Sequence, residues 1–133
     1  MGGIGSPIQN VTRGMPMSAI LIVEDEVLTS EYLEFVLQGA GYEAIPAGSA
    51  EEALAVLEHR DDVNLAVTDI HLPGSMNGLQ LAALIRERWP AINIVVVTAY
   101  GAPESDELPA GSLFVSKPYS AQKMIDAVHH FQD

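Results

Sequence analysis

Five side chains able to do acid, hydroxyl or amine chemistry lie where apolar segments of the chain end. Glu24 and Asp25 follow one segment, Asp69 follows a second, Thr98 ends a third, and Lys117 comes just after a fourth. Three carboxylates brought close together repel one another, which raises the pKa of one or more of them. Mg²⁺ removes that cost, because it prefers oxygen ligands and is typically held by one or two carboxylates plus a phosphate.

The hydroxyl and the amine complete a set suited to phosphoryl transfer. Lys117 supplies a mobile positive charge that can pair with Asp69 and later with a phosphoryl oxygen, and Thr98 offers a hydroxyl donor. Phosphoryl transfer needs mainly charge neutralisation and positioning, and the Asp69 carboxylate would be the nucleophile. Each residue alone has an ordinary explanation as a turn or a cap. Their joint occurrence, in order along the chain, favours the functional interpretation.

Alternating strand and helix patterns must position these residues. The first helix carries Tyr32, Leu33, Val36 and Leu37 at helical spacing, which predicts that this face is buried. Capping patterns at Ser49, Asn77 and Ser120 predict the starts of three further helices. The expected strands cover residues 19–23, 43–46, 64–68, 92–97 and 112–115, and the expected helices begin near residues 29, 50, 78 and 121.

This alternation predicts an α/β fold, a doubly wound five-stranded parallel sheet with the flavodoxin-like order 2-1-3-4-5. Its functional crevice lies outside the carboxyl ends of the strands. Only eighteen residues separate Thr98 from Lys117, and they include Pro103 and Pro109. Because proline breaks helix interiors, the helix between the fourth and fifth strands is expected to be short or irregular.

Composition excludes several classes of function. The 133 residues suffice for one domain, and the net charge of −12, with six basic residues in no run, argues against a nucleic-acid surface. The absence of cysteine excludes disulfides and thiolate sites. No apolar run is long enough to span a membrane, and no signal pattern opens the chain. We therefore expect a disordered leader over residues 1–17, in part derived from expression, a domain over residues 18–133, and a cytoplasmic location.

The ordered set of motifs resembles the response regulator receiver family of two-component signalling. Any single motif is weak, but the set spans almost everything after residue 19 and is highly specific. The matching motifs are Leu21-Ile-Val-Glu-Asp-Glu26, Thr68-Asp-Ile-His-Leu-Pro73 leading to Met76-Asn-Gly78, Val97-Thr-Ala99 and Phe114-Val-Ser-Lys-Pro118.

The resemblance implies a role for each site residue. Asp69 would be the phosphoacceptor and, with Asp25, a direct Mg²⁺ ligand. Glu24, where the family more often has Asp, would act on the metal through a water, and the backbone carbonyl of His71 would be a further ligand. The loop after Asp69 is one residue longer than the common form, with Asn77 replacing the usual Asp, which affects loop shape more than chemistry.

Other residues would bind the phosphoryl group and relay its presence. Thr98 and Lys117 would contact the phosphoryl oxygens, and Pro118 would follow a cis peptide bond. Phe114 lies where the family has a switch aromatic, although a plain core role is an equal alternative. Bulky His71 and Tyr100 flank the path of attacking water, so we expect at most slow self-dephosphorylation and no other enzymatic activity.

The resemblance also implies partners. A histidine kinase or histidine-phosphotransfer protein would supply the phosphate, and phosphorylation would switch contacts with a downstream protein target. We expect a stand-alone receiver or phosphorelay shuttle; the alternative is an isolated fragment of a larger response regulator or hybrid kinase. Homodimerisation through the fourth and fifth strands and the last helix is common in the family, but a shortened helix between those strands weakens that transfer.

Two other classes of function fit less well. A Mg²⁺-dependent phosphatase of the haloacid-dehalogenase type would use Asp69 as nucleophile, but His71 occupies the position of its general acid. A nucleotide- or flavin-binding module would need a glycine-rich phosphate loop after the first strand, where acidic residues 24–26 would instead repel phosphate.

Overall fold

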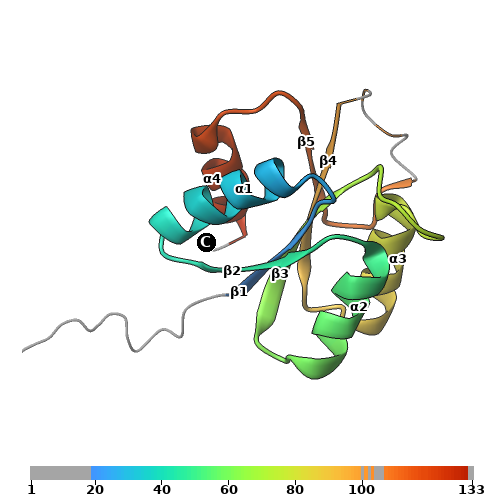
Figure 1. Ribbon diagram of the computed structural model, residues 1–133. Coiled ribbons are helices and arrows are strands. Elements are labelled where there is room, and N and C mark those ends of the chain that lie inside the picture. Colours follow the sequence, from blue (N-terminus) through green and yellow to red (C-terminus); the bar gives the residue numbers. More distant parts are fainter. Residues whose placement is uncertain (1–18, 100, 102, 104–106, 132–133) are drawn as a thin grey trace, which may run out of the picture.

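Five parallel strands form the centre of the molecule (Figure 1). The computed structural model describes residues 19–99, 101, 103 and 107–131. The strand order is β2-β1-β3-β4-β5, which confirms the doubly wound topology expected from the sequence. The strands are β1 (Ala19–Val23), β2 (Glu43–Ala47), β3 (Val63–Asp69), β4 (Asn93–Thr98) and β5 (Leu113–Ser116).

Helices cover both faces of this sheet. Figure 1 shows α1 and α4 on one side and α2 and α3 on the other. The bounds are α1 (Val27–Gly39), α2 (Ala50–His59), α3 (Gly78–Arg88) and α4 (Ala121–His130). The predicted caps are confirmed, because the side chains of Ser49, Asn77 and Ser120 each accept a backbone N–H three residues further on. At Asn77 the Gln80 side chain returns the bond, forming a complete capping box.

The core has two layers because alternate strand residues point to opposite faces of the sheet. On the side of α2 and α3, Leu21, Ala66 and Ile94 pack against those helices. On the side of α1 and α4, Ile22 and Val67 belong to the second buried cluster. The central strands are therefore buried on both faces, which explains their continuous apolar runs.

Two expectations about helices need comment. The pattern predicts that Tyr32 shares the buried face, but its exposed fraction is 46%, because the stripe of α1 that packs on the sheet contains Leu33, Val36 and Leu37 and Tyr32 lies to one side of it. Between β4 and β5, the described residues 99, 101, 103 and 107–112 include none in an α-helix, in agreement with the predicted irregularity. The expected leader and Tyr100 lie outside the described residues.

Candidate functional site

Backbone hydrogen bonds tie the carboxyl ends of neighbouring strands together. Each bond links the residue directly after one strand to a carbonyl of the adjacent strand. The candidate side chains are therefore attached to backbone that is fixed at the edge of the sheet. The bonds run from Glu24 N to Ala47 O (3.0 Å), from Ile70 N to Val97 O (3.0 Å) and from Lys117 N to Thr98 O (2.9 Å).

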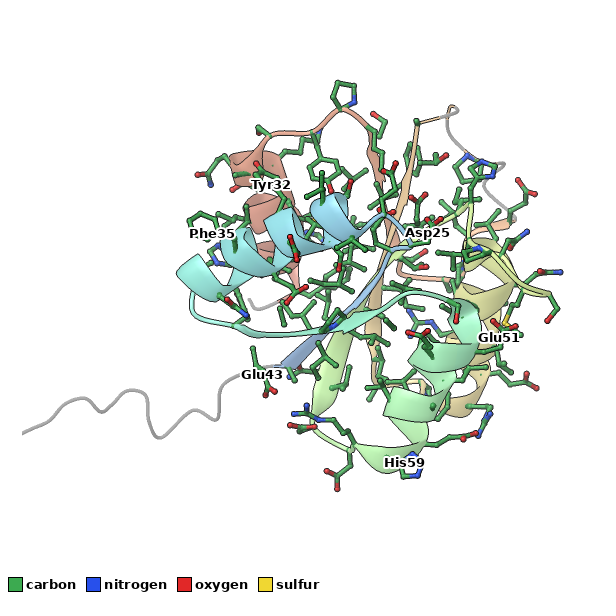
Figure 2. All side chains as sticks on the ribbon, in the orientation of Figure 1. Asp25, Tyr32, Phe35, Glu43, Glu51 and His59 are labelled. Carbon is green, nitrogen blue, oxygen red and sulfur yellow. The ribbon has the colours of Figure 1, made fainter. Side chains whose placement is uncertain are left out.

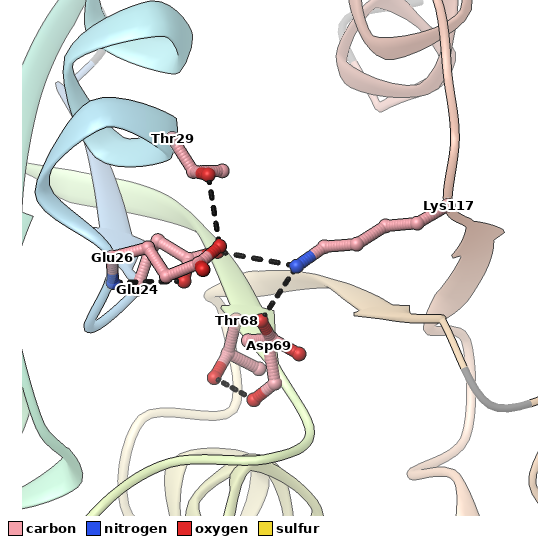
Figure 3. Close-up of polar contacts among 6 residues, drawn as sticks. All are labelled: Glu24, Glu26, Thr29, Thr68, Asp69 and Lys117. Carbon is pink, nitrogen blue, oxygen red and sulfur yellow. Dashed lines mark hydrogen bonds and ion pairs between the residues drawn. The ribbon is translucent and has the colours of Figure 1, made fainter.

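Lys117 reaches across this edge to two acidic side chains from different strands. Its Nζ lies 2.8 Å from Asp69 Oδ2 and 3.5 Å from Glu24 Oε1, as Figure 3 shows. Both acids are buried, with exposed fractions of 9% for Asp69 and 5% for Glu24. Glu24 Oε2 also accepts a hydrogen bond from its neighbour, the Glu26 backbone N–H, at 3.1 Å. Residues 93 positions apart thus share one small polar pocket.

Burial and charge act in opposite directions at this pocket. Burial raises the pKa of Glu24, and the nearby negative charge of Asp69 adds to the rise, while the Glu26 N–H and Lys117 oppose it. Burial by itself would lower the pKa of Lys117, but the hydrogen bond and charge of Asp69 and the charge of Glu24 outweigh it, so the net pKa is raised. Lys117 is therefore held in its charged form.

Tyr119 lies beside the same charges. Burial raises the pKa of this tyrosine to about 12, because desolvation disfavours the phenolate; Lys117 acts to lower the pKa, while the negative charges of Glu24 and Asp69 act to raise it. Its ring packs against the core cluster on the side of α1 and α4. The hydroxyl is thus a neutral group at any physiological pH.

The other predicted site residues take different positions. Thr98 is buried at the end of β4, and Phe114 in β5 is half-buried. Asp25 and His71 are exposed; Figure 2 shows Asp25 at the carboxyl end of β1. The peptide bond between Lys117 and Pro118 is cis, as expected. The structure therefore brings Glu24 and Asp69 into contact with the ammonium of Lys117, while Asp25 lies at the solvent-exposed rim of the polar pocket.

The carboxylate oxygens of the site could hold a hard cation only together with other ligands, such as water or backbone carbonyls. Within the described part of the chain, no three acidic or imidazole side chains form a group able to hold a metal ion. Glu24 and Asp69 nevertheless place two buried carboxylates against a single ammonium. Because Mg²⁺ keeps several waters and often uses only one or two carboxylates, this donor set is compatible with it.

Two residues at the site belong to the matching motifs, but the sequence analysis assigns them no role. Thr68 is fully buried, and its hydroxyl donates to the backbone carbonyl of Asp69 at 2.9 Å. Gly78 lies so close that a Cβ there would be 1.8 Å from the same carbonyl oxygen. The available signals were a hydroxyl in an otherwise apolar run beside the acid, and a glycine directly after a helix cap.

An apolar groove opens next to the polar pocket. Its volume is about 620 Å³, and Lys117 forms part of its wall. On α1 it is bordered by Leu28, Thr29 and Tyr32, and on the opposite side by Pro118 and Tyr119. Leu28 is 81% exposed, so the groove presents apolar surface to solvent beside Lys117, the ion-pair partner of Asp69.

Comparisons with known proteins agree with this geometry. The family model of the response regulator receiver domain matches residues 20–129, and the chain belongs to that family. It is 37% identical over 112 residues to the response regulator protein FleR of Pseudomonas aeruginosa, covering 82% of this chain and 23% of FleR. It is 35% identical to the sensory transduction protein RegX3 of Mycolicibacterium smegmatis, covering 82% of this chain and 48% of RegX3. The chain thus spans about half or less of these relatives.

Solved structures give the same result. A receiver domain protein from Methanospirillum hungatei superposes with a TM-score of 0.79 at 29% identity, covering 87% of this chain and 94% of that one. The response regulator protein TrrA from Thermotoga maritima has a TM-score of 0.78 at 33% identity, covering 86% and 98%. The protein is therefore a receiver domain of two-component signalling, a family of signalling proteins rather than classical enzymes. None of its described helices is both long and apolar enough to cross a membrane.

Proposed function

We propose that Asp69 accepts a phosphoryl group from the phosphohistidine of a histidine kinase or histidine-phosphotransfer protein. The observation that carries this proposal is the buried Asp69 carboxylate paired at 2.8 Å with Lys117. In the reaction an Asp69 oxygen forms a bond to phosphorus while the phosphorus–nitrogen bond of the donor breaks. The departing imidazole keeps the bonding electron pair and takes up a proton. Lys117 pairs with the carboxylate before transfer and with a phosphoryl oxygen after it.

The acidic residues would hold Mg²⁺ during this transfer. Glu24, Asp25, Asp69 and the carbonyl of His71 are the proposed ligands, with Glu24 acting through a water. When bound, the metal would neutralise charge on the phosphoryl oxygens. The placement of Glu24 and Asp69 supports the proposal, because two buried carboxylates from different strands lie against the single ammonium of Lys117. The relative TrrA was solved in complex with Mg²⁺–BeF.

Phosphorylation would be transmitted through β4 and β5. Thr98 would bind a phosphoryl oxygen, and half-buried Phe114 would move with it, changing the surface offered to a downstream protein target. The downstream target could be a second receiver domain, so that phosphorylation would favour a homodimer. We expect slow self-dephosphorylation at most, and a cytoplasmic location, where kinases have ATP.

The groove beside Lys117 is the proposed docking surface for the phosphodonor. A donor must bring its phosphohistidine to the buried Asp69, and the groove provides solvent-exposed apolar area on the open side of that residue. Leu28 and Tyr32 occupy one face of α1 at a spacing of four residues, as a helix-binding surface requires. The donor would therefore lie along α1.

Intact mass after incubation with acetyl phosphate and Mg²⁺ tests the function. We expect one phosphate adduct, which disappears in Asp69→Asn and in the presence of a chelator. The matched control is Asp61→Asn, because Asp61 is an exposed acid at the opposite end of β3. An adduct that survives in Asp69→Asn would place the acceptor elsewhere and contradict the proposal.

A further inference from the structure

The backbone carbonyl of Asp69 is enclosed from two directions. The Thr68 hydroxyl donates to this oxygen at 2.9 Å, as drawn in Figure 3. From α3, Gly78 approaches so closely that an added Cβ would lie 1.8 Å from the same oxygen and 2.7 Å from its carbon. Both contacts concern the main chain of the phosphoacceptor rather than its carboxylate.

These contacts come from the face of the sheet opposite to Lys117. Side chains alternate along a strand, so Thr68 shares a face with Ala66, which packs toward α2 and α3. Asp69 points to the other face, where Lys117 meets it. The peptide that carries the Asp69 side chain is therefore held from the face of the sheet opposite to Lys117.

The adjoining peptide is held as well. Ile70 N donates to Val97 O at 3.0 Å, and Gly78 N donates to Ile70 O at 2.7 Å. The first bond ties the residue after Asp69 to β4, and the second ties it to the first residue of α3. With Thr68, these bonds satisfy the polar groups of the chain as it leaves the sheet, where a ladder partner is no longer available.

We propose that Thr68 is a positioning residue for the phosphoacceptor, acting through the carbonyl of Asp69 with Gly78 as the surface against which that carbonyl rests. The proposal rests on the function proposed above. A carboxylate is attached to its peptide by only two rotatable bonds, so a rotation of the peptide displaces its oxygens relative to Lys117. Reaction rates depend steeply on such displacements, with about 100-fold lost for 1 Å.

The test is the initial rate of phosphate incorporation from acetyl phosphate, measured by intact mass at saturating Mg²⁺. Thr68→Val keeps the branched shape and removes the hydroxyl, and we expect the maximal rate to fall about tenfold, as the loss of one buried hydrogen bond predicts. The acetyl phosphate concentration for half-maximal rate should stay unchanged, because Thr68 does not touch the donor. Thr68→Ser should restore the rate.

The control for a lost hydroxyl is Ser112→Ala. Ser112 also donates to a backbone carbonyl, that of Pro109 at 2.6 Å, but it precedes β5 and so lies at the opposite end of the sheet. Its removal should leave the phosphorylation rate unchanged. Circular dichroism and urea unfolding of each variant separate a loss of positioning from a loss of fold.

Thr68→Ala is the second variant and decides the matter if Thr68→Val does not fold, because it also removes the hydroxyl and introduces a smaller side chain. We expect it to slow phosphorylation as well. Gly78→Ala does not serve this purpose, because its Cβ would meet the backbone of Asp69 at 1.8 Å and disturb the fold itself. Equal maximal rates in the wild type and in a folded Thr68→Val or Thr68→Ala variant would overturn this inference and leave the proposed function intact. A wild-type protein that takes up no phosphate would overturn the proposed function and the inference together.

Discussion

Lys117 is the residue on which the electrostatics of the site depend. One ammonium contacts two buried carboxylates, at 2.8 Å and 3.5 Å, so the pocket keeps an excess of negative charge. Removing one partner from such a group leaves the others uncompensated. This excess of negative charge supports the proposed binding of a cation, and the proposed phosphorylation of Asp69 would give Lys117 a new partner.

At Glu24 the cost of burying a charge opposes the gain from pairing with Lys117. The raised pKa of Glu24 means that the folded state favours the protonated form. This preference contributes to the stability of the fold below about pH 4, and the contribution is lost as the pH rises through the raised pKa. At pH 7 the ionised Glu24 thus costs folding free energy. We expect Glu24→Gln to unfold at a higher urea concentration than the wild type at pH 7, with the difference shrinking in acid.

The control for this prediction is Glu31→Gln, which changes the same charge at an exposed position of α1. It should alter the urea midpoint little at either pH. A Glu24→Gln protein less stable than the wild type at pH 7 would mean that the interaction with Lys117 outweighs the cost of burial.

At the scale of the elements, α1 combines two roles. Its buried stripe, including Leu33 and Leu37, packs on the sheet. Its opposite side exposes several large apolar residues, whereas the solvent-facing side of a helix usually carries few of them. Those residues are Val27, Leu28, Tyr32 and Phe35, two of them labelled in Figure 2. Because the groove beside Lys117 begins on this helix, the proposed docking of the phosphodonor would place it next to the site.

Leu28→Glu tests the docking role of α1. The side chain is 81% exposed, so stability should change by no more than about 0.5 kcal/mol. Phosphoryl transfer from a phosphorylated histidine kinase core that labels the wild type should be at least about tenfold slower, the loss expected when a residue at the centre of an interface is replaced. The rate with acetyl phosphate should not change, because that donor needs no docking surface.

The matched control is Ala83→Glu, which introduces the same charge at an exposed position of α3. It should support wild-type transfer from the kinase core. If Leu28→Glu is labelled as fast as Ala83→Glu, the donor docks elsewhere on the molecule.

At the scale of the whole molecule, parallel topology gathers polar chemistry at one edge. All five strands run the same way, so residues following β1, β3 and β5 meet although the chain separates them widely. A net charge of −12 surrounds this edge with a negative field that attracts cations. The fold and the composition therefore act together in favour of a divalent metal.

Mg²⁺ should stabilise the folded protein as a whole. At a concentration 100-fold above its dissociation constant it adds about 2.7 kcal/mol, a rise in thermal midpoint on the order of 10 °C for a chain of this size. Differential scanning calorimetry against NaCl of equal ionic strength separates binding from general screening. The rise should be smaller in Asp69→Asn and retained in Asp61→Asn; equal rises in both would place the metal away from Asp69.

Much of the architecture could be predicted from local patterns. The continuous apolar run of β1 and the capping box between Asn77 and Gln80 depend on neighbours in the chain, so they are visible in the sequence. The ends of α1 and the exposure of Tyr32 were less predictable, because helix boundaries depend on packing against the sheet. The order of the motifs also predicts Asp69, Thr98 and Lys117 as site residues.

The residue types, their order and the alternation of strands and helices can be read from the sequence, since they follow from side-chain chemistry and short-range periodicity. Which groups touch depends on the folded chain. It joined Lys117 to both Glu24 and Asp69, left Asp25 at the rim, and brought Gly78 against the Asp69 carbonyl. Such contacts depend on sheet register and helix docking, which are set by packing of the whole core and not by any local pattern.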